Sequence, residues 1–231
     1  MALIEREMPV NRVAEMLGVL PQRIWTVFNH WVANARQSDD PSTVHRLGID
    51  ETSTKKGHNY VTLGVDLDTS RVIHVVEGKG KETLAGIQQY LECKGVQKRR
   101  VTQLSMDLSP AVIAGAADSS PLAEITFDRF HVVKLLNEAM DKVRKAEGKE
   151  HDDLKGLKYV FMVFAKTVKA HWTGIVNFVE TRITNGVMEG INSKIQLAKR
   201  RARGYRNINN FISMIYFTCG KMTFSYPRYS T

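Results

Sequence analysis

Cysteine is scarce in this sequence, with only Cys93 and Cys219 among 231 residues. The two lie far apart and form no Cys-x-x-Cys pair, which excludes a zinc finger or a disulfide framework and favours a reducing cytoplasm. Long apolar runs are also missing, since the longest, Tyr159–Ala165, is too short to cross a bilayer. The charged N-terminus, Met1–Met8, lacks the apolar core of a signal peptide. We therefore expect a cytoplasmic protein with no membrane partner.

Acidic residues are missing from the C-terminal part of the chain. Residues 190–231 contain eight Lys or Arg and no Asp or Glu, so they carry +8 of the formal net charge of +9. Such a charge favours an anionic partner, and nucleic acid is the first expectation. The length allows one sizeable domain and a small one.

The basic region begins with a stretch that predicts a two-faced helix, Thr184–Arg206. Asn185 is suited to cap its start and Gly204 to end it. At helical spacing the apolar face comprises Val187, Ile191, Ile195, Ala198 and Ala202. The opposite face comprises Asn185, Glu189, Asn192, Gln196 and Lys199.

Glu189 is the single acid of this stretch. A lone carboxylate at the start of a basic helix is suited to hold a divalent metal while adjacent cations hold a phosphate backbone. The alternative is a solvated basic helix in which Glu189 makes a local ion pair.

The middle of the sequence alternates between strand and helix patterns, and Asn207 is suited to cap a last helix, Ile208–Thr218. The expected strands are Val44–Asp50, Tyr60–Leu67, Arg71–Val76, Val101–Leu108 and Ile125–Phe127. The expected helices are Lys81–Cys93, Pro110–Ala117 and Arg129–Glu147, the last with Asp128 as its cap and Val132, Leu135, Leu136, Ala139 and Val143 facing inward. A three-stranded meander, a helix and then strand–helix–strand–helix is the order of a ribonuclease H-like α/β fold with a five-stranded mixed sheet.

The N-terminal segment Pro9–Arg36 predicts two short helices separated at Gly18. The first is marked by Val13, Met16 and Leu17, and the second begins at Pro21 with Ile24, Phe28 and Trp31 on one face. This pattern resembles a helix-turn-helix whose second helix presents Gln22, Arg23, Thr26 and His30 to a DNA groove. The alternative is a helical hairpin that packs on the main domain.

Four sequence blocks resemble the catalytic domain of bacterial insertion-sequence transposases of the ISL-three family. They are T-N-G-x-x-E-G-x-N-x-K-I followed by K-R-R-A-R-G-Y-R-N, L-G-I-D-E-T-S at Leu47–Ser53, S-M-D-L-S-P at Ser105–Pro110 and F-D-R-F-H-V-V-K-L-L-N-E-A at Phe127–Ala139. The blocks follow in the family's order from about Val44 to Phe217. The resemblance implies the ribonuclease H-like fold and an Asp-Asp-Glu active site.

Carried onto this sequence, the family's catalytic and metal-binding acids are Asp50, Asp107 and Glu189. Asp50 is expected to end the first strand and Asp107 the fourth, which are neighbours in such a sheet. Three converging carboxylates repel one another unless divalent metals lie between them, and oxygen ligands favour Mg²⁺ or Mn²⁺, here two ions. Three questions stay open: whether Glu51 is the ligand instead of Asp50, whether Asp107 caps the following helix, and whether Asp128 or His131 assists.

The expected partner is DNA, both element ends and target, bound by a homo-oligomer associated with the nucleoid. The expected DNA-binding residues form two groups. Phosphate contacts are expected from Lys194, Lys199, Arg200, Arg201, Arg203 and Arg206, and any reading of the DNA sequence from the N-terminal helices, with Gln22 and Arg23. We expect a partial helix-turn-helix at residues 1–36, a linker at 37–43 and a catalytic domain at 44–231.

Two departures from the family pattern bear on the expected activity. The family begins with a cysteine-rich zinc-binding segment that is missing here, and the helical insertion before the glutamate is shortened to about Gly148–Ile183. The resemblance implies metal-dependent cleavage at element ends and transfer of the 3′-hydroxyl into target DNA. The alternatives are a catalytically defective DNA-binding and oligomerising remnant, or a simple metal-dependent nuclease. From the missing parts we expect nonspecific DNA binding and no autonomous transposition.

Overall fold

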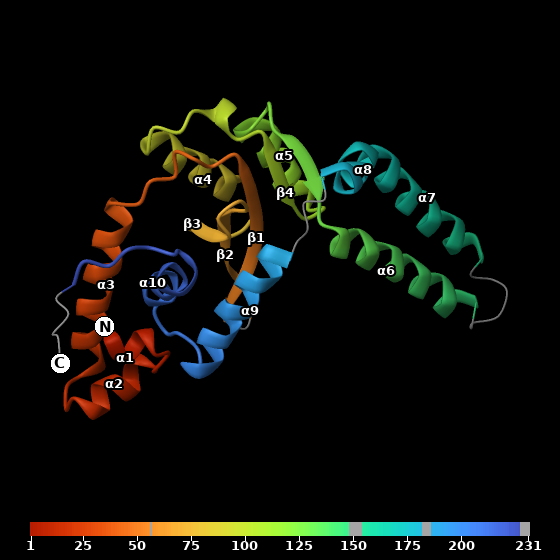
Figure 1. The fold of residues 1–231 in the computed structure, drawn as a ribbon. Helices are drawn as coiled ribbons and strands as arrows, with labels where there is room; N and C mark the ends of the chain where they lie inside the picture. Colours follow the sequence, from red (N-terminus) through yellow and green to blue (C-terminus); the bar gives the residue numbers. More distant parts are fainter. Residues whose placement is uncertain (56, 148–153, 182–185, 227–231) are drawn as a thin grey trace.

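A computed structural model describes residues 1–55, 57–147, 154–181 and 186–226 of the chain (Figure 1). The strands are β1 (Arg46–Lys55), β2 (Asn59–Asp66), β3 (Arg71–Glu77), β4 (Gln103–Met106) and β5 (Glu124–Phe127). The helices are α1 (Ala2–Glu5), α2 (Val10–Met16), α3 (Pro21–Gln37), α4 (Lys81–Cys93), α5 (Pro110–Ser119), α6 (Arg129–Glu147), α7 (Leu154–Ala170), α8 (Trp172–Thr181), α9 (Gly186–Arg201) and α10 (Ile208–Cys219), with a short 3₁₀ turn at Lys98–Arg100.

The five strands form one mixed sheet in the order β3-β2-β1-β4-β5. β1, β2 and β3 pair antiparallel as a meander, and β4 and β5 continue the sheet in parallel with β1. This topology confirms the predicted ribonuclease H-like α/β fold.

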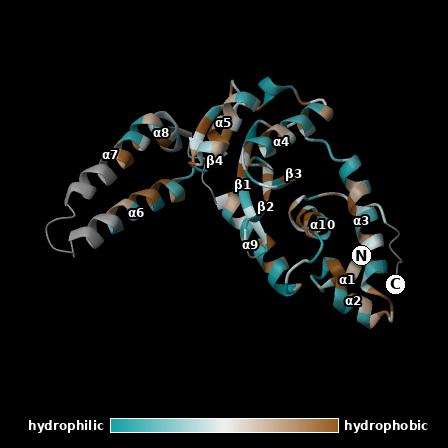
Figure 2. Ribbon diagram, turned by 180° about the vertical axis from the view of Figure 1, so that it is seen from behind, coloured by the Kyte–Doolittle hydropathy of each residue, from teal (hydrophilic) through white to brown (hydrophobic). Residues whose placement is uncertain are grey.

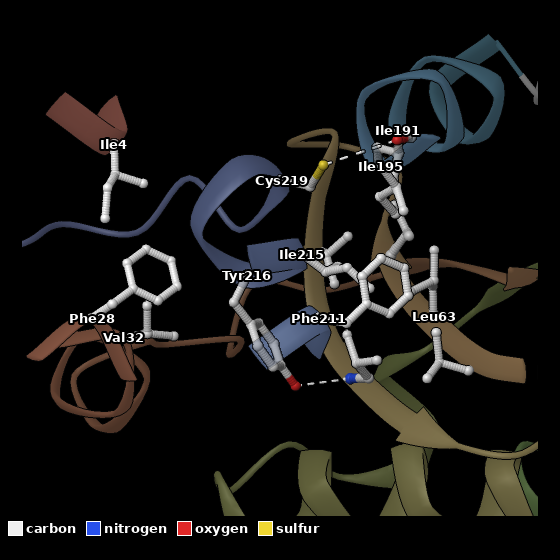
Figure 3. Packing of buried hydrophobic residues seen from close by; sticks show 14 of the residues in the cluster. Ile4, Phe28, Val32, Leu63, Ile191, Ile195, Phe211, Ile215, Tyr216 and Cys219 are labelled. Atoms are coloured by element: carbon white, nitrogen blue, oxygen red, sulfur yellow. Dashed lines mark hydrogen bonds between the residues drawn. The ribbon is translucent and has the colours of Figure 1, made fainter. Parts of the chain in front are cut away.

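Alternation along the strands gives the sheet two apolar faces. Leu47 and Ile49 of β1 point toward α4 and α5, in one buried cluster. Leu63 of β2 belongs to a second cluster, which contains residues of α9, α10, α3 and α2. Figure 3 shows this second cluster, with Phe211 and Ile215 of α10 near Leu63. In Figure 2 α10 is coloured largely as hydrophobic, in keeping with its position between the sheet and α3.

The N-terminal helices pack against α10 and share its core. The rings of Phe28 and Phe217 lie 5.1 Å apart at their centroids, and the Asn29 amide donates to Asn210 over 2.9 Å. The helical pair was predicted correctly, including the break at Gly18, whose φ is +66°. Met16 and Leu17, two of the residues that marked the first predicted helix, are exposed, because Val10, Val13 and Ala14 form the buried face of α2.

The segment after α3 is held by side chains of the main domain. The Lys94 ammonium donates to the carbonyl oxygens of Arg36, Gln37 and Asp39 at 3.1, 2.9 and 2.9 Å, respectively. Arg71 also pairs with Asp39. These contacts satisfy the carbonyl groups at the end of α3 and tie the predicted linker to the sheet.

Helices α6, α7 and α8 form an arm beyond β5, in which α6 and α7 extend away from the sheet and α8 packs against β5 (Figure 1). At the base of this arm Gly174 lets α8 approach β5, since a Cβ there would lie 2.5 Å from the Phe127 ring. The Asn177 amide donates to the Ile125 carbonyl over 3.0 Å. Leu136 was predicted to face inward but is exposed, because α6 leaves the sheet and packs mainly on α7.

The arm confirms that the predicted insertion is helical over its described residues. Asp128 caps α6 as predicted, its Oδ1 accepting from the Phe130 N–H over 2.8 Å. Residues 148–153, the Val143 side chain and the predicted cap Asn185 lie outside the described part.

Most predicted boundaries in the domain hold, and β1 and β4 are the main exceptions. β1 was predicted to end at Asp50 but continues to Lys55, because Thr52 and Ser53 pair with Val61 and Tyr60 of β2. β4 covers only residues 103–106, fewer than the predicted strand. α10 is capped by Asn207 as predicted. None of the described helices is long and apolar enough to cross a membrane.

Replacing Tyr216 with Phe should destabilise the fold by about 1–3 kcal/mol. The Tyr216 hydroxyl accepts the Val75 N–H over 2.8 Å at the edge strand β3, and the substitution leaves this buried donor unpaired. Urea unfolding measures the change. Tyr205→Phe is the matched control and should cost less, since its hydroxyl lies 3.5 Å from the Ala198 carbonyl oxygen. Equal losses in the two variants would contradict this role.

Candidate active site

Asp50 and Asp107 lie at the same level on neighbouring parallel strands. β1 and β4 pair in parallel through Gly48 and Ser105, and both acids follow two residues later. Because side chains alternate with a period of two, both acids point to the sheet face covered by α9 and α10. Asp50 was predicted to end its strand, but it lies inside β1, two residues beyond the last pair with β4.

The surroundings of Asp50 disfavour its ionised form. Burial raises the pKa of the Asp50 carboxyl, and the negative charge of Asp107 adds to this increase. Hydrogen bonds from the Glu51 N–H, at 2.8 Å, and from the Asn192 amide oppose it. The site thus holds two neighbouring carboxylates whose repulsion a cation would relieve.

Glu51 lies on the opposite face of β1, with Leu47 and Ile49. Burial raises the pKa of the Glu51 carboxyl, and the negative charge of Asp107 raises it further. Lys79 and a backbone hydrogen bond from Gly80 lower this pKa. Glu51 therefore interacts electrostatically with Asp107, although only Asp50 contacts α9.

α9 lies against β1 through its polar face. Asn192 donates to Asp50, Gln196 donates to the Thr52 hydroxyl over 3.0 Å, and the Lys199 ammonium donates to the Ser53 carbonyl over 2.8 Å. The contacts advance in the same direction along both elements. Seven helix positions and three strand positions both span about 10 Å, so the two surfaces stay in register.

Gly48 makes this close packing possible. A Cβ at position 48 would lie 2.8 Å from the Met188 sulfur of α9 and 2.8 Å from the Leu67 side chain. The glycine of the L-G-I-D-E block therefore allows α9 to lie close to β1, two residues before Asp50.

Glu189 lies on α9 one turn before Asn192 and is exposed. Within the described part of the chain it forms no ion pair, so the predicted alternative of a local ion pair has no support there. The described residues also contain no group of three His, Cys, Asp or Glu side chains placed to hold a metal ion. The structure thus brings Asp50 and Asp107 together and places Glu189 on the helix that contacts Asp50.

Asn192 is a fixed position of the Thr184–Ile195 motif, but the sequence analysis gave it no role in the site. Its Oδ1 atom is buried and has no hydrogen-bond donor within the described structure. A buried amide oxygen and two carboxylates are hard oxygen donors of the kind that Mg²⁺ and Mn²⁺ favour. This donor set fits a divalent cation beside Asp50. The available signal was the position of Asn192 on the polar face, three residues after Glu189.

Two of the open sequence questions concern His131 and Asp107. The Nδ1 atom of His131 lies 2.6 Å from Asp128, and this hydrogen bond raises the pKa of His131, with smaller contributions from Asp107 and Asp50. The neighbouring acids therefore favour the imidazolium form of His131. Asp107 also accepts the Ser109 N–H over 3.1 Å, so it stabilises the start of α5 as well as facing Asp50.

The predicted phosphate-binding cluster divides into two groups. Lys199 donates to Ser53, and Arg201 pairs with Glu7, so both help to hold α9 in place. Lys194, Arg200, Arg203 and Arg206 are exposed and form no ion pair with the described residues. Gln22 and Arg23 are also exposed, on the first turn of α3.

Comparison with known proteins gives one family and two kinds of relative. A family model described as Transposase matches residues 47–164 and 157–215, and its name contains both DDE and ISL3. The transposase for insertion sequence element IS1557 of Mycobacterium tuberculosis is 30% identical over 116 residues, which cover 50% of this chain and 26% of that protein. The transposase for insertion sequence element IS1001 of Bordetella parapertussis is 24% identical over 250 aligned positions, covering 76% of this chain and 61% of that protein. The chain thus spans less than two thirds of each relative.

In the metal-free protein, His131 should titrate above its ordinary pKa of 6.5 because Asp128 favours the imidazolium. Its contribution to stability is then complete below pH 6.5 and is lost as the pH rises through the folded-state pKa. Asp128→Asn should lower this pKa while preserving the helix cap, since Asn caps as well as Asp. NMR titration of the imidazole protons measures both values. An unchanged His131 pKa in Asp128→Asn would contradict the assignment.

Proposed function

Because this chain belongs to the ISL-three family of insertion-sequence transposases, we propose that it catalyses metal-dependent cleavage of DNA at element ends and transfer of the 3′-hydroxyl into target DNA. The observation that carries this proposal is the position of the two acids: Asp50 on β1 and Asp107 just after β4 each lie two residues beyond the paired Gly48 and Ser105, and Asp50 contacts the polar face of α9. A buried carboxyl whose pKa is raised, Asp50, beside a second acid, Asp107, suits a cation and not a structural ion pair.

In the proposed site Asp50 and Asp107 hold Mg²⁺ or Mn²⁺, and Glu189 completes the ligand set from α9. When bound, two such ions supply activation of the attacking oxygen and stabilisation of the leaving oxygen. The Asn192 amide orients the Asp50 carboxylate through its hydrogen bond. His131, held by Asp128, places a positive charge near the acids and favours their ionised state.

The exposed cations at the end of α9 would position the DNA backbone for this reaction. Arg200, Arg203 and Arg206 are the best suited, since Lys199 and Arg201 already bind protein groups. Phosphate contacts position the duplex without reading its sequence, a task that would fall to Gln22 and Arg23 on α3. The partners are thus DNA and, on it, further copies of the chain, in the bacterial cytoplasm.

The exposed position of Glu189 favours a second candidate function. The described residues provide no three-acid group, so the chain could bind DNA and oligomerise without cutting it. The two candidates differ in whether Glu189 is needed for any metal-dependent activity.

Replacing Asp50 or Asp107 with Asn, or Glu189 with Gln, should abolish Mg²⁺- or Mn²⁺-dependent cleavage of DNA that contains an element end. Each change removes a negative ligand and keeps the side-chain volume, so DNA binding should survive. A nicking assay and a gel-shift assay measure the two activities. Asp118→Asn removes an exposed acid that pairs with Lys81 and serves as the control. Parental cleavage by the Glu189→Gln protein would exclude Glu189 from the site.

Mg²⁺ or Mn²⁺ should raise the melting temperature at pH 7 by several degrees in the parent. Binding at one hundred times Kd adds about 2.7 kcal/mol, and each kcal/mol shifts Tm by about 2–4 °C in a protein of this size. Because the folded pKa of Asp50 is raised, its stabilising contribution belongs to low pH and is lost as the pH rises, so relief by a cation is largest at neutral pH. Asp50→Asn should abolish the shift, and an equal shift in that variant would place the ion elsewhere.

Neutralising Arg200, Arg203 and Arg206 together should weaken binding to unrelated DNA sequences alike. The slope of log affinity against log salt should fall by about 0.9 for each duplex phosphate that no longer pairs with an arginine. Fluorescence anisotropy at several salt concentrations measures it. The control variant neutralises Lys98, Arg99 and Arg100, which changes the charge equally on the 3₁₀ turn between α4 and β4. The same slope in both variants would show that the arginines do not contact the backbone.

A further inference from the structure

A groove lies between the N-terminal helices and the turn that joins α9 to α10. Its volume is about 1360 Å³. Its walls come from α2 and α3, from the end of β1 and from residues 199–210. Pockets for small ligands occupy about 300–1,000 Å³, so this groove suits a longer molecule.

The groove is predominantly positive. Lys55, Arg203 and Arg206 line it, and so does Arg201, which pairs with Glu7. The acid among the lining residues, Glu15, is neutralised by Arg12 at 2.6 Å. An anionic polymer matches this charge and this volume.

Aromatic and amide groups distinguish the groove from a plain phosphate-binding surface. Trp25 and Tyr205 line it with their ring centroids 6.1 Å apart, one from α3 and one from the α9–α10 turn. Gln22 and Asn29 line it as well, and the Asn29 Oδ1 atom is buried without a donor within the described structure. Aromatic rings stack on bases and amides hydrogen-bond base edges, but a paired duplex hides its base faces.

We propose that this groove binds an unpaired segment of a DNA strand through base stacking on Trp25 and Tyr205 and phosphate contacts to Arg203 and Arg206. This inference rests on the proposed function, because the strand would continue from the groove to the acids. Lys55 follows Asp50 by five strand residues, about 17 Å. At the 3.4 Å spacing of one strand of B-form DNA, this corresponds to roughly five nucleotides.

Binding is measured by fluorescence anisotropy in EDTA, which removes cleavage from the experiment. The probes are a short fluorescein-labelled single strand, the blunt duplex of the same sequence and that duplex with a single-stranded overhang. The single strand and the overhang should bind more tightly than the blunt duplex. The salt slope for the single strand should approach about 0.7 for each phosphate contact rather than about 0.9. Equal affinity for the blunt duplex would overturn the proposal.

Two variants test the groove itself. Trp25→Leu should weaken single-strand binding about tenfold, within the range expected for removal of one base stack, and the matched control Trp31→Leu on the same helix should not. Arg203→Asn with Arg206→Gln should also weaken it, and Asn tolerates the left-handed backbone at position 203, where φ is +55°. Arg99→Gln with Arg100→Gln is the charge-matched control. Circular dichroism confirms folding of each variant.

The outcomes separate this inference from the proposed function. If the Trp25 and Arg203/Arg206 variants bind single-stranded DNA as tightly as their control variants, and the parent still cleaves element ends, only the proposal for the groove is overturned. Single-strand binding that depends on Trp25 and Arg203, in a parent that cleaves no DNA with Mg²⁺ or Mn²⁺, would overturn the proposed cleavage and keep the groove.

Discussion

The contact between the polar face of α9 and strand β1 is the interaction on which the rest of the structure depends. The side chains of Asn192, Gln196 and Lys199 on the helix donate hydrogen bonds to three residues of the strand. The acceptors are Asp50, Thr52 and Ser53, respectively. Gly48 allows the close approach, because any side chain there would meet Met188. A helix held in this way carries Glu189 at one end and the basic turn at the other. The candidate active site and the candidate DNA surface are thus two ends of one rigid element.

The other faces of α9 fix it from behind. Ile191 and Ile195 are buried in the cluster that contains α10 and α3, and Figure 3 shows them above Phe211. Arg201 pairs with Glu7, which joins the end of α9 to the N-terminal segment. The N-terminal helices therefore form one wall of the groove, as part of the same packed body.

Burial and charge at the acid pair have a physical consequence for the fold. Asp50 is largely removed from water beside a second carboxylate, and the hydrogen bonds from Asn192 and the Glu51 backbone only partly offset this cost. Groups held in such unfavourable states occur preferentially at functional sites, where a ligand or ion removes the penalty. The structure contrasts this pair with Asp66, which is buried but accepts from Thr69 and lies near Arg71.

Local patterns predicted the elements whose signals are short-range. The bounds of α4 and α6 and the Asp128 and Asn207 caps follow from apolar periodicity and capping chemistry within a few residues. The predictions that failed depended on distant partners. Leu136 has the spacing of a core residue but its helix leaves the sheet, and the polar residues after Asp50 became strand because β2 pairs with them.

The sequence by itself determined the fold family, the family membership and the acids to examine, because ordered motifs and hydrophobic periods are properties of the chain alone. The tertiary structure decided which of those residues meet. It placed Asp50 with Asp107 and Asn192, directed Glu51 to the other face, and used Lys199 and Arg201 as anchors. It also brought Trp25 beside Tyr205, which lies far along the chain. These contacts depend on strand register and on the helix docking enabled by Gly48, and both arise only when distant segments pack together.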